Sequence, residues 1–92
     1  MYIESAKLTF YISYAASIKD KRQVCRSLIQ KTRQRFNAAI AEVDTQDRHQ
    51  TLTIGVAVIS GDAGHAQRML DEIIRFMEEH TDASLTECEL SE

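Results

Sequence analysis

The sequence predicts an α+β domain in which two helices cover one face of a four-stranded antiparallel sheet. Four segments alternate apolar and polar residues with the period of a half-buried strand, and two longer segments carry apolar residues at helical spacing. These segments follow one another as strand, helix, strand, strand, helix, strand. Ninety-two residues suffice for one hydrophobic core and are too few for two, so we assign residues 1–92 to a single domain.

The first predicted strand covers residues 4–14, because apolar residues occupy the even-numbered positions from Ala6 to Ile12. We expect these even-numbered side chains to face the core. A helix is then expected from Ser17 to about Phe36. Ser17 and Asp20 have the spacing of a capping box, in which two side chains satisfy unpaired amides at the start of a helix.

Three further elements complete the predicted order. Residues 38–44 alternate again and form a short strand, and residues 50–60 form the strand with the strongest pattern, with large aliphatic side chains on one face. An amphipathic helix capped by Asp62 follows, and residues 84–90 alternate once more. In the short strand the side chains expected to face inward are Ala39, Ala41 and Val43.

This order of elements is the split βαβ arrangement of ferredoxin-like domains. We therefore expect a βαββαβ sandwich with the sheet order 4-1-3-2, both helices on one face, and the strand 38–44 at an edge. The second face of the sheet is predicted to be open to solvent or to a partner. Its predicted residues are Thr9, Tyr11, Thr53, Gly55 and Ala57.

Basic residues are concentrated in the first predicted helix, although the net charge of the chain is −3. Seven of its eleven Lys and Arg residues lie between positions 19 and 35. Four of them fall within an arc of about 60° on a helical projection, and Lys21 lies in the same first turn. Free amides and cations at a helix start favour phosphate groups. The predicted RNA- or anion-binding residues are Lys19, Lys21, Arg22, Arg26 and Arg33. The alternative is a solvated face whose long side chains cover the apolar flank.

No complete catalytic constellation is present, so we expect a protein that is not an enzyme and needs no cofactor or metal. Cys25 and Cys88 lack any C-x-x-C or metal-ligand spacing, and both are expected to be reduced and mostly buried thiols. A third hypothesis is a Mg²⁺-dependent phosphodiesterase. Glu42 and Asp44, two positions apart on one strand, would then project from the same face beside Asp47. Charges on an edge strand equally serve to block edge-to-edge pairing.

No apolar run approaches the length of about 20 residues that a helix needs to cross a bilayer. The N-terminus lacks the basic and then apolar layout of a signal peptide. We therefore expect a cytoplasmic protein without a membrane partner.

Four segments of the sequence are similar to those of a known family. They are Ser17-Ile18-Lys19-Asp20-Lys21-Arg22, Arg35-Phe36-Asn37, Ala41-Glu42-Val43-Asp44-Thr45-Gln46-Asp47 and Gly55-Val56-Ala57-Val58. In this order they resemble the YlxP-like family of small bacterial domains of unknown function over nearly the whole chain. The chain departs from the family at Ile18, Cys25 and Gly61, and in the loop at 47–50, where D-L-W-Q is the common form.

The resemblance implies a ferredoxin-like fold, a cytoplasmic bacterial protein and a connection to RNA or the ribosome, since such proteins are often encoded beside translation and ribosome-maturation factors. It implies no catalytic residue. Together with the basic helix, it predicts a noncatalytic RNA- or ribosome-associated binding module. The alternative is a protein-interaction or homodimerising domain that uses the open sheet face.

Overall fold

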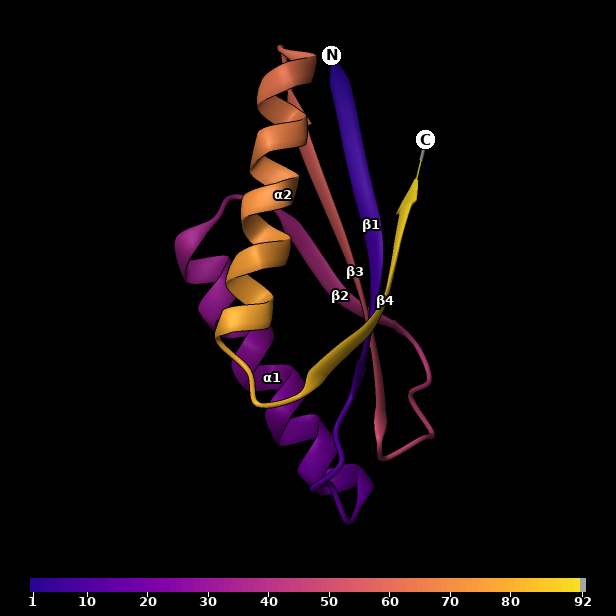
Figure 1. Ribbon diagram of the computed structural model, residues 1–92. Coiled ribbons are helices and arrows are strands. Elements are labelled where there is room, and N and C mark those ends of the chain that lie inside the picture. The colour runs from indigo at the N-terminus through magenta and orange to yellow at the C-terminus, as the bar shows by residue number, and fades with distance from the viewer. Residues whose placement is uncertain (92) are drawn as a thin grey trace.

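The computed structural model describes residues 1–91 as a four-stranded antiparallel sheet with two helices on one face (Figure 1). The elements in chain order are β1 Tyr2–Tyr11, α1 Ile18–Arg35, β2 Ala39–Asp44, β3 Thr51–Ser60, α2 Ala63–Glu79 and β4 Ser84–Ser91. The strands are arranged in the order β2-β3-β1-β4. The predicted ferredoxin-like sandwich with order 4-1-3-2 is therefore confirmed.

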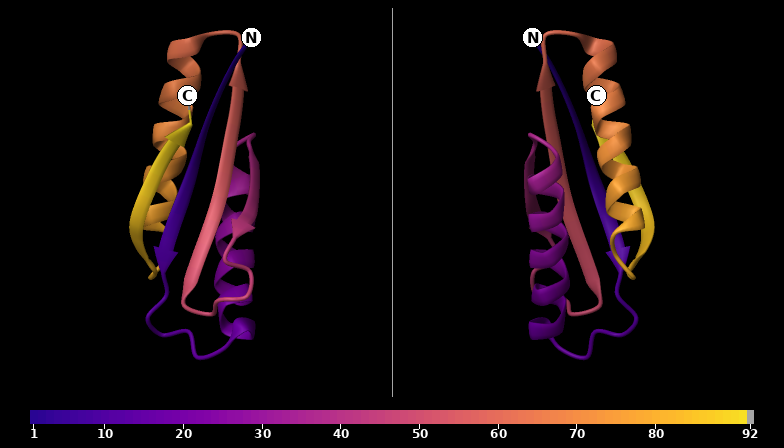
Figure 2. Two further views of the ribbon diagram at one scale, coloured as in Figure 1. Left: turned by 90° about the vertical axis from the view of Figure 1, so that its right-hand side faces the viewer. Right: turned by 90° about the vertical axis from the view of Figure 1, so that its left-hand side faces the viewer.

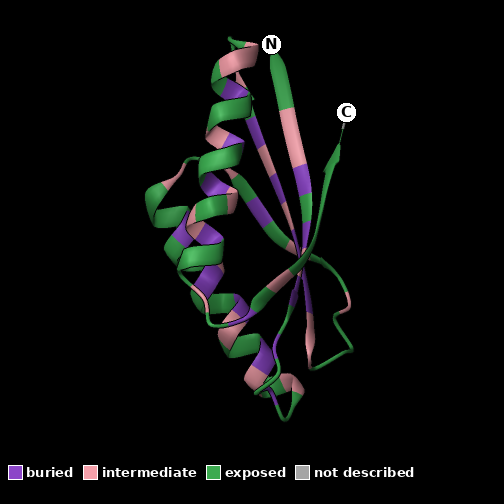
Figure 3. Cartoon of the chain, viewed as in Figure 1, coloured by how far each residue is buried: buried purple, intermediate pink, exposed green. Residues whose placement is uncertain are grey.

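The two central strands place their large apolar side chains beneath the helices. β1 and β3 pair antiparallel along all ten residues of each strand. Their even-numbered apolar side chains are buried, and Phe10 and Leu52 have no exposed surface (Figure 3). The predicted inward faces of these strands are confirmed. The hydrophobic core consists mainly of these side chains and the buried faces of the two helices.

The two faces of the sheet differ in what covers them. α2 packs against β1 and β3, and α1 lies beside the edge strand β2. Figure 2 (left) shows the other face, across which β4, β1, β3 and β2 lie with both helices behind them. Within residues 1–91 no helix covers this open face. No helix of the described chain is both long enough and apolar enough to span a membrane.

β2 turns to the core the face opposite to the one predicted. Ile40 is 3% exposed and lies opposite Val56, whereas Ala39, Ala41 and Val43 are exposed. The physical reason is that burying a large aliphatic side chain removes far more apolar surface from water than burying an alanine does. The prediction that Ala39, Ala41 and Val43 face inward was wrong.

A β-bulge in β2 separates two carboxylates that were predicted to share a face. Glu42 lies opposite Ile54 on the helix-covered side, and Asp44 lies opposite Thr53 on the open side. The register shifts between the two acids, which leaves Val43 without a partner in β3. An extra residue of this kind reverses the alternation of side chains along a strand. The prediction of one shared face was therefore wrong.

Both predicted helix caps are confirmed. The Ser17 hydroxyl accepts the N–H of Asp20 at 3.1 Å, and the Asp20 carboxylate accepts the N–H of Ala16 at 2.9 Å. Asp62 caps α2 by accepting the N–H of His65 at 3.1 Å. Backbone hydrogen bonds from His65 and Gly64 lower the pKa of the Asp62 carboxyl below its ordinary value. These contacts fix where α1 and α2 begin.

Replacing Ser17 by alanine is expected to lower the free energy of unfolding by about 1 kcal/mol, because an amide at the start of α1 loses its acceptor. For a domain of this size the melting temperature should fall by about 4–8 °C, as measured by circular dichroism. Ser27→Ala, at an exposed position in the middle of α1, is the control. Equal losses in both variants would contradict the capping role.

Candidate functional site

Four of the five predicted phosphate-binding residues are exposed along α1. They are Lys19, Arg22, Arg26 and Arg33, here named the basic flank. On a regular helix these positions share an arc of about 60° and span about 21 Å of axis, at 1.5 Å per residue. The site is therefore a straight row of cations on one side of a single helix.

No member of the basic flank forms an ion pair with a carboxylate within residues 1–91. The ion pairs of this part of the chain are Lys7–Asp44, Lys7–Glu89 and Lys21–Glu42. Asp20, the acid of the first turn, is occupied as a cap of the preceding loop. No carboxylate of the described part of the chain therefore pairs with the charges of the basic flank.

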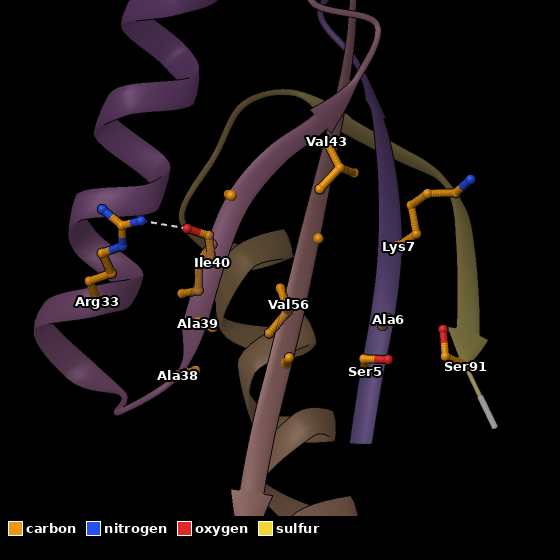
Figure 4. Close-up of a pocket in the computed structure, with 13 residues that line it drawn as sticks. Ser5, Ala6, Lys7, Arg33, Ala38, Ala39, Ile40, Val43, Val56 and Ser91 are labelled. Carbon is orange, nitrogen blue, oxygen red and sulfur yellow. Dashed lines mark hydrogen bonds between the residues drawn. The ribbon is translucent and has the colours of Figure 1, made fainter. Parts of the chain in front are cut away.

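The C-terminal end of the basic flank lies beside the edge strand. The Arg33 guanidinium donates to the carbonyl oxygen of Ile40 at 2.5 Å (Figure 4). This contact occupies an acceptor of β2, and covering backbone groups of an edge strand discourages pairing with another chain. Arg33 therefore has a structural contact. Within residues 1–91, the side chains of Lys19, Arg22 and Arg26 make no hydrogen bond or ion pair.

Lys21 does not belong to the exposed surface, and its predicted place there is corrected. Its side chain is 1% exposed. Its ammonium group lies 3.0 Å from a carboxylate oxygen of Glu42, donates to the Arg48 carbonyl at 2.6 Å, and also donates to the Thr45 carbonyl. Position 21 lies at least about 100° around the helix from the basic flank. The ammonium group therefore donates to two carbonyl oxygens beside the Glu42 carboxylate and is not available to phosphate.

The buried lysine connects two of the segments on which the family resemblance rests. Lys21 comes from the first of them, and Glu42 and Thr45 come from the third. Thr45 has a φ of 61°, a left-handed conformation that is uncommon for a β-branched residue. Its hydroxyl contacts the Thr51 carbonyl and the Thr53 hydroxyl, both at 3.1 Å. Lys21 thereby holds the β2–β3 loop against the start of α1.

The role of Lys21 was missed, although the sequence carries a signal for it. The buried residues of α1 are Lys21, Cys25, Leu28 and Thr32. Their spacing of four, three and four is the repeat of a buried helical stripe. A lysine in register with such a stripe is expected to reach an internal acceptor, because an unpaired buried charge is very costly.

The three acids of the phosphodiesterase hypothesis are not brought together as ligands. Glu42 contacts Lys21 behind the sheet, Asp44 contacts Lys7 at 3.5 Å on the open face, and Asp47 is exposed in the loop. Among residues 1–91 no group of three or more His, Cys, Asp or Glu side chains is placed to hold a metal ion. This geometry gives the hypothesis no support.

The two cysteines are free thiols in different environments. Cys25 is buried, as predicted, but Cys88 is exposed. The prediction for Cys88 was wrong because β4 is an edge strand, and all of its residues except Leu85 are exposed. Desolvation is the largest cause that raises the pKa of both thiols, which disfavours the reactive thiolate.

The open sheet face carries a shallow, mainly apolar hollow of about 580 Å³, shown in Figure 4. The Val43 side chain leans across Gly55, where an added Cβ would lie only 2.9 Å from a Val43 methyl group. Of the predicted open-face residues, Tyr11 is exposed, but Thr53 is almost fully buried by its neighbours. Most of the lining consists of small side chains, among them Ser5, Ala39, Ala41, Gly55, Ala57 and Ser91.

The split βαββαβ topology and the single helix-covered sheet face define a ferredoxin-like α+β domain. The chain matches the family described as Protein of unknown function (DUF503) over residues 3–90, and it belongs to that family. It is also 28% identical over 64 residues to the "Uncharacterized protein YlxP" of Bacillus subtilis (strain 168), a match that covers 70% of each chain. The resemblance to the YlxP-like family is thus confirmed. Neither description assigns an activity.

Proposed function

We propose that this domain is a noncatalytic module that binds structured RNA, alone or within the ribosome, through phosphate contacts of the basic flank. The observation that carries the proposal is a row of exposed cations that have no carboxylate partner within residues 1–91, on an otherwise acidic chain. The cytoplasm, which holds the ribosomes, is the compartment in which we expect such a module to act.

The cations are arranged unfavourably for the isolated protein. Like charges at i, i+4, as in Arg22 and Arg26, destabilise a helix by about 0.2–0.5 kcal/mol per pair. Cations in the first turn, such as Lys19, also lie at the positive end of the helix dipole, at a cost of about 0.3–1 kcal/mol each. A bound polyanion would offset both costs by its attraction to these cations. The arrangement is therefore more readily explained by an anionic partner than by stability.

The distribution of charge favours one orientation of a polyanion. Residues 76–91 contain five acids and no Lys or Arg, and they form the end of α2 and all of β4. β4 and β2 are the opposite edges of the sheet, and α1 lies beside β2. An RNA would be repelled by the β4 edge and attracted to the basic flank.

The proposed contact reads the RNA backbone and not its bases. Phosphate contacts fix the position and orientation of a protein on a nucleic acid but carry no sequence information. No aromatic residue belongs to the basic flank, so stacking on unpaired bases has no platform there. We therefore expect recognition of folded, double-helical RNA with little dependence on sequence.

The test is the affinity for a fluorescein-labelled RNA hairpin, measured by fluorescence anisotropy. The triple variant Lys19→Ala, Arg22→Ala and Arg26→Ala is expected to bind at least about tenfold more weakly than the wild type, which corresponds to about 1.4 kcal/mol. All three side chains are exposed, so the fold should survive the substitutions. Circular dichroism would verify this.

A second triple variant removes the same amount of charge elsewhere. It carries Lys31→Ala, Arg68→Ala and Arg75→Ala, three exposed positions outside the basic flank. This control should bind the hairpin within about threefold of the wild type. Equal weakening of both variants would show that only the net charge matters and not its position on the basic flank. Unchanged binding by the first variant would refute the proposal.

A further inference from the structure

The open sheet face is more apolar than a solvent-exposed surface requires. Ile3 and Ile59 form a cross-strand pair and are 61% and 58% exposed. A second depression beside this pair shares Ala38, Ala39 and Ala57 with the 580 Å³ hollow. The two depressions thus form one continuous apolar surface, from the isoleucine pair to Val43. Contiguous exposed apolar surfaces of this kind mark interaction sites.

We propose that the open face binds the open face of a second copy of this chain, with a two-fold axis parallel to the strands. The proposal concerns the open sheet face, which shares Arg33 with the basic flank, and the dimer is measured in the absence of RNA. In such a dimer the two sheets form the inner layers and the helices the outer layers. Aligned sheets of this kind pack about 10 Å apart and cross at about 30°.

The area of the face suffices for a small dimer interface. The strands β1, β2, β3 and β4 hold ten, six, ten and eight residues, and at about 3.4 Å per residue and about 4.8 Å between strands they cover roughly 550 Å². The pair would bury about 1,100 Å² in total, just above the roughly 1,000 Å² that a specific interface needs.

The charges at the two edges of the face select the direction of the axis. Arg33 lies at the β2 edge and lines the hollow. Glu87 and Glu89 pair with open-face residues of β1 and mark the β4 edge. An axis parallel to the strands places β2 over the partner's β4, which brings Arg33 toward these acids. An axis across the strands would place β4 over the partner's β4 and set the acids against each other.

The same axis gives the lysine at the centre of the face an apolar neighbour. It places β1 over the partner's β3, and Lys7 and Gly55 are direct neighbours in the β1–β3 register. The Lys7 side chain of one copy therefore lies near the Gly55 position of the partner, where its aliphatic stem packs on the Val43 side chain that leans across the glycine. Lys7 already contacts Asp44 and Glu89 at 3.5 and 3.4 Å, so its charge stays paired at the interface.

The test is the mass in solution, measured by sedimentation equilibrium over a wide range of protein concentration. The wild type should approach about 21 kDa, twice the 10.5 kDa of the chain. Ala41→Glu places a carboxylate in the hollow at an exposed position and should give a monomer. Gln30→Glu makes the same charge change on exposed α1 and should leave the dimer intact. Ala39→Glu replaces the first variant if that variant fails to fold.

A charge exchange tests the axis. Arg33→Glu should weaken the dimer at least tenfold, and adding Glu87→Arg should restore most of that loss. A wild-type mass of 10.5 kDa at every concentration, or a dimer that survives both Ala41→Glu and Ala39→Glu, would overturn the proposal. A folded double variant that remains as weak as Arg33→Glu alone would overturn the proposed axis.

Discussion

Replacing Lys21 by methionine is expected to lower the free energy of unfolding by about 3–5 kcal/mol, the usual loss when one partner of a buried ion pair is removed. Methionine keeps most of the length of the side chain but leaves the Glu42 carboxylate without its cation and the Thr45 and Arg48 carbonyls without their shared donor. Domains of this kind have only about 5–15 kcal/mol of stability. If the wild type lies at the lower end of this range, a loss of about 5 kcal/mol would unfold the variant at room temperature.

Urea denaturation followed by circular dichroism measures this loss. Lys31→Met on the same helix is the control, because Lys31 is exposed and its replacement should change stability by less than about 0.5 kcal/mol. In the double variant Lys21→Met with Glu42→Leu no charge is left unpaired. Its loss should fall short of the sum of the two single losses by more than about 1 kcal/mol. Additive losses would show that the ion pair is not energetically coupled.

Replacing Phe10 by alanine is expected to cost about 3–5 kcal/mol, because it removes a large side chain from the core and leaves a cavity. Phe10 has no exposed surface and lies opposite Leu52 and Leu85 in the neighbouring strands. The next residue, Tyr11, lies on the open face and is 45% exposed. Tyr11→Ala should cost less than about 1 kcal/mol in the monomer.

The same urea titration compares the two variants at protein concentrations low enough to exclude dimers. A large difference between two adjacent positions follows from the alternation of side chains along β1. Similar losses for Phe10→Ala and Tyr11→Ala would mean that both faces of β1 are buried. That result would contradict the two-layer arrangement.

The central strands could be predicted from the sequence because their pattern is strong. In β3 every even-numbered position from Leu52 to Val58 is a large aliphatic residue. The odd-numbered positions between them, which point to the other face, are small or polar. A one-residue change of register would expose the whole apolar set, so only one register is stable. The helix caps were predictable for a similar reason, since Ser17 and Asp62 act on amides only three residues away.

The exposed face of β2 and the partner of Lys21 could not be predicted in the same way, because both depend on distant contacts. β2 has six residues, and its alternation is broken by the bulge that leaves Val43 unpaired with β3. A bulge in so short a strand leaves no clear period to read. The Lys21–Glu42 contact joins residues 21 positions apart, and the surrounding basic residues made Lys21 look like one more member of an exposed row.

The basic flank itself was predictable because it needs only a regular helix. Lys19, Arg22, Arg26 and Arg33 share an arc as soon as α1 forms, whatever the rest of the chain does. The absence of an acidic partner among the residues that the structure describes depends on tertiary structure and could not be predicted from the sequence. It is this fact that turns a charge pattern into a candidate interface.

The most direct measurement is the salt dependence of hairpin binding by the wild type and by the Lys19→Ala, Arg22→Ala and Arg26→Ala variant between about 50 and 200 mM salt. Each phosphate contact contributes about 0.7–0.9 to the slope of log K against log salt, through release of counterions. Phosphate binding by the basic flank predicts that the variant's slope is shallower by about 2–3. Parallel lines of equal affinity would contradict it.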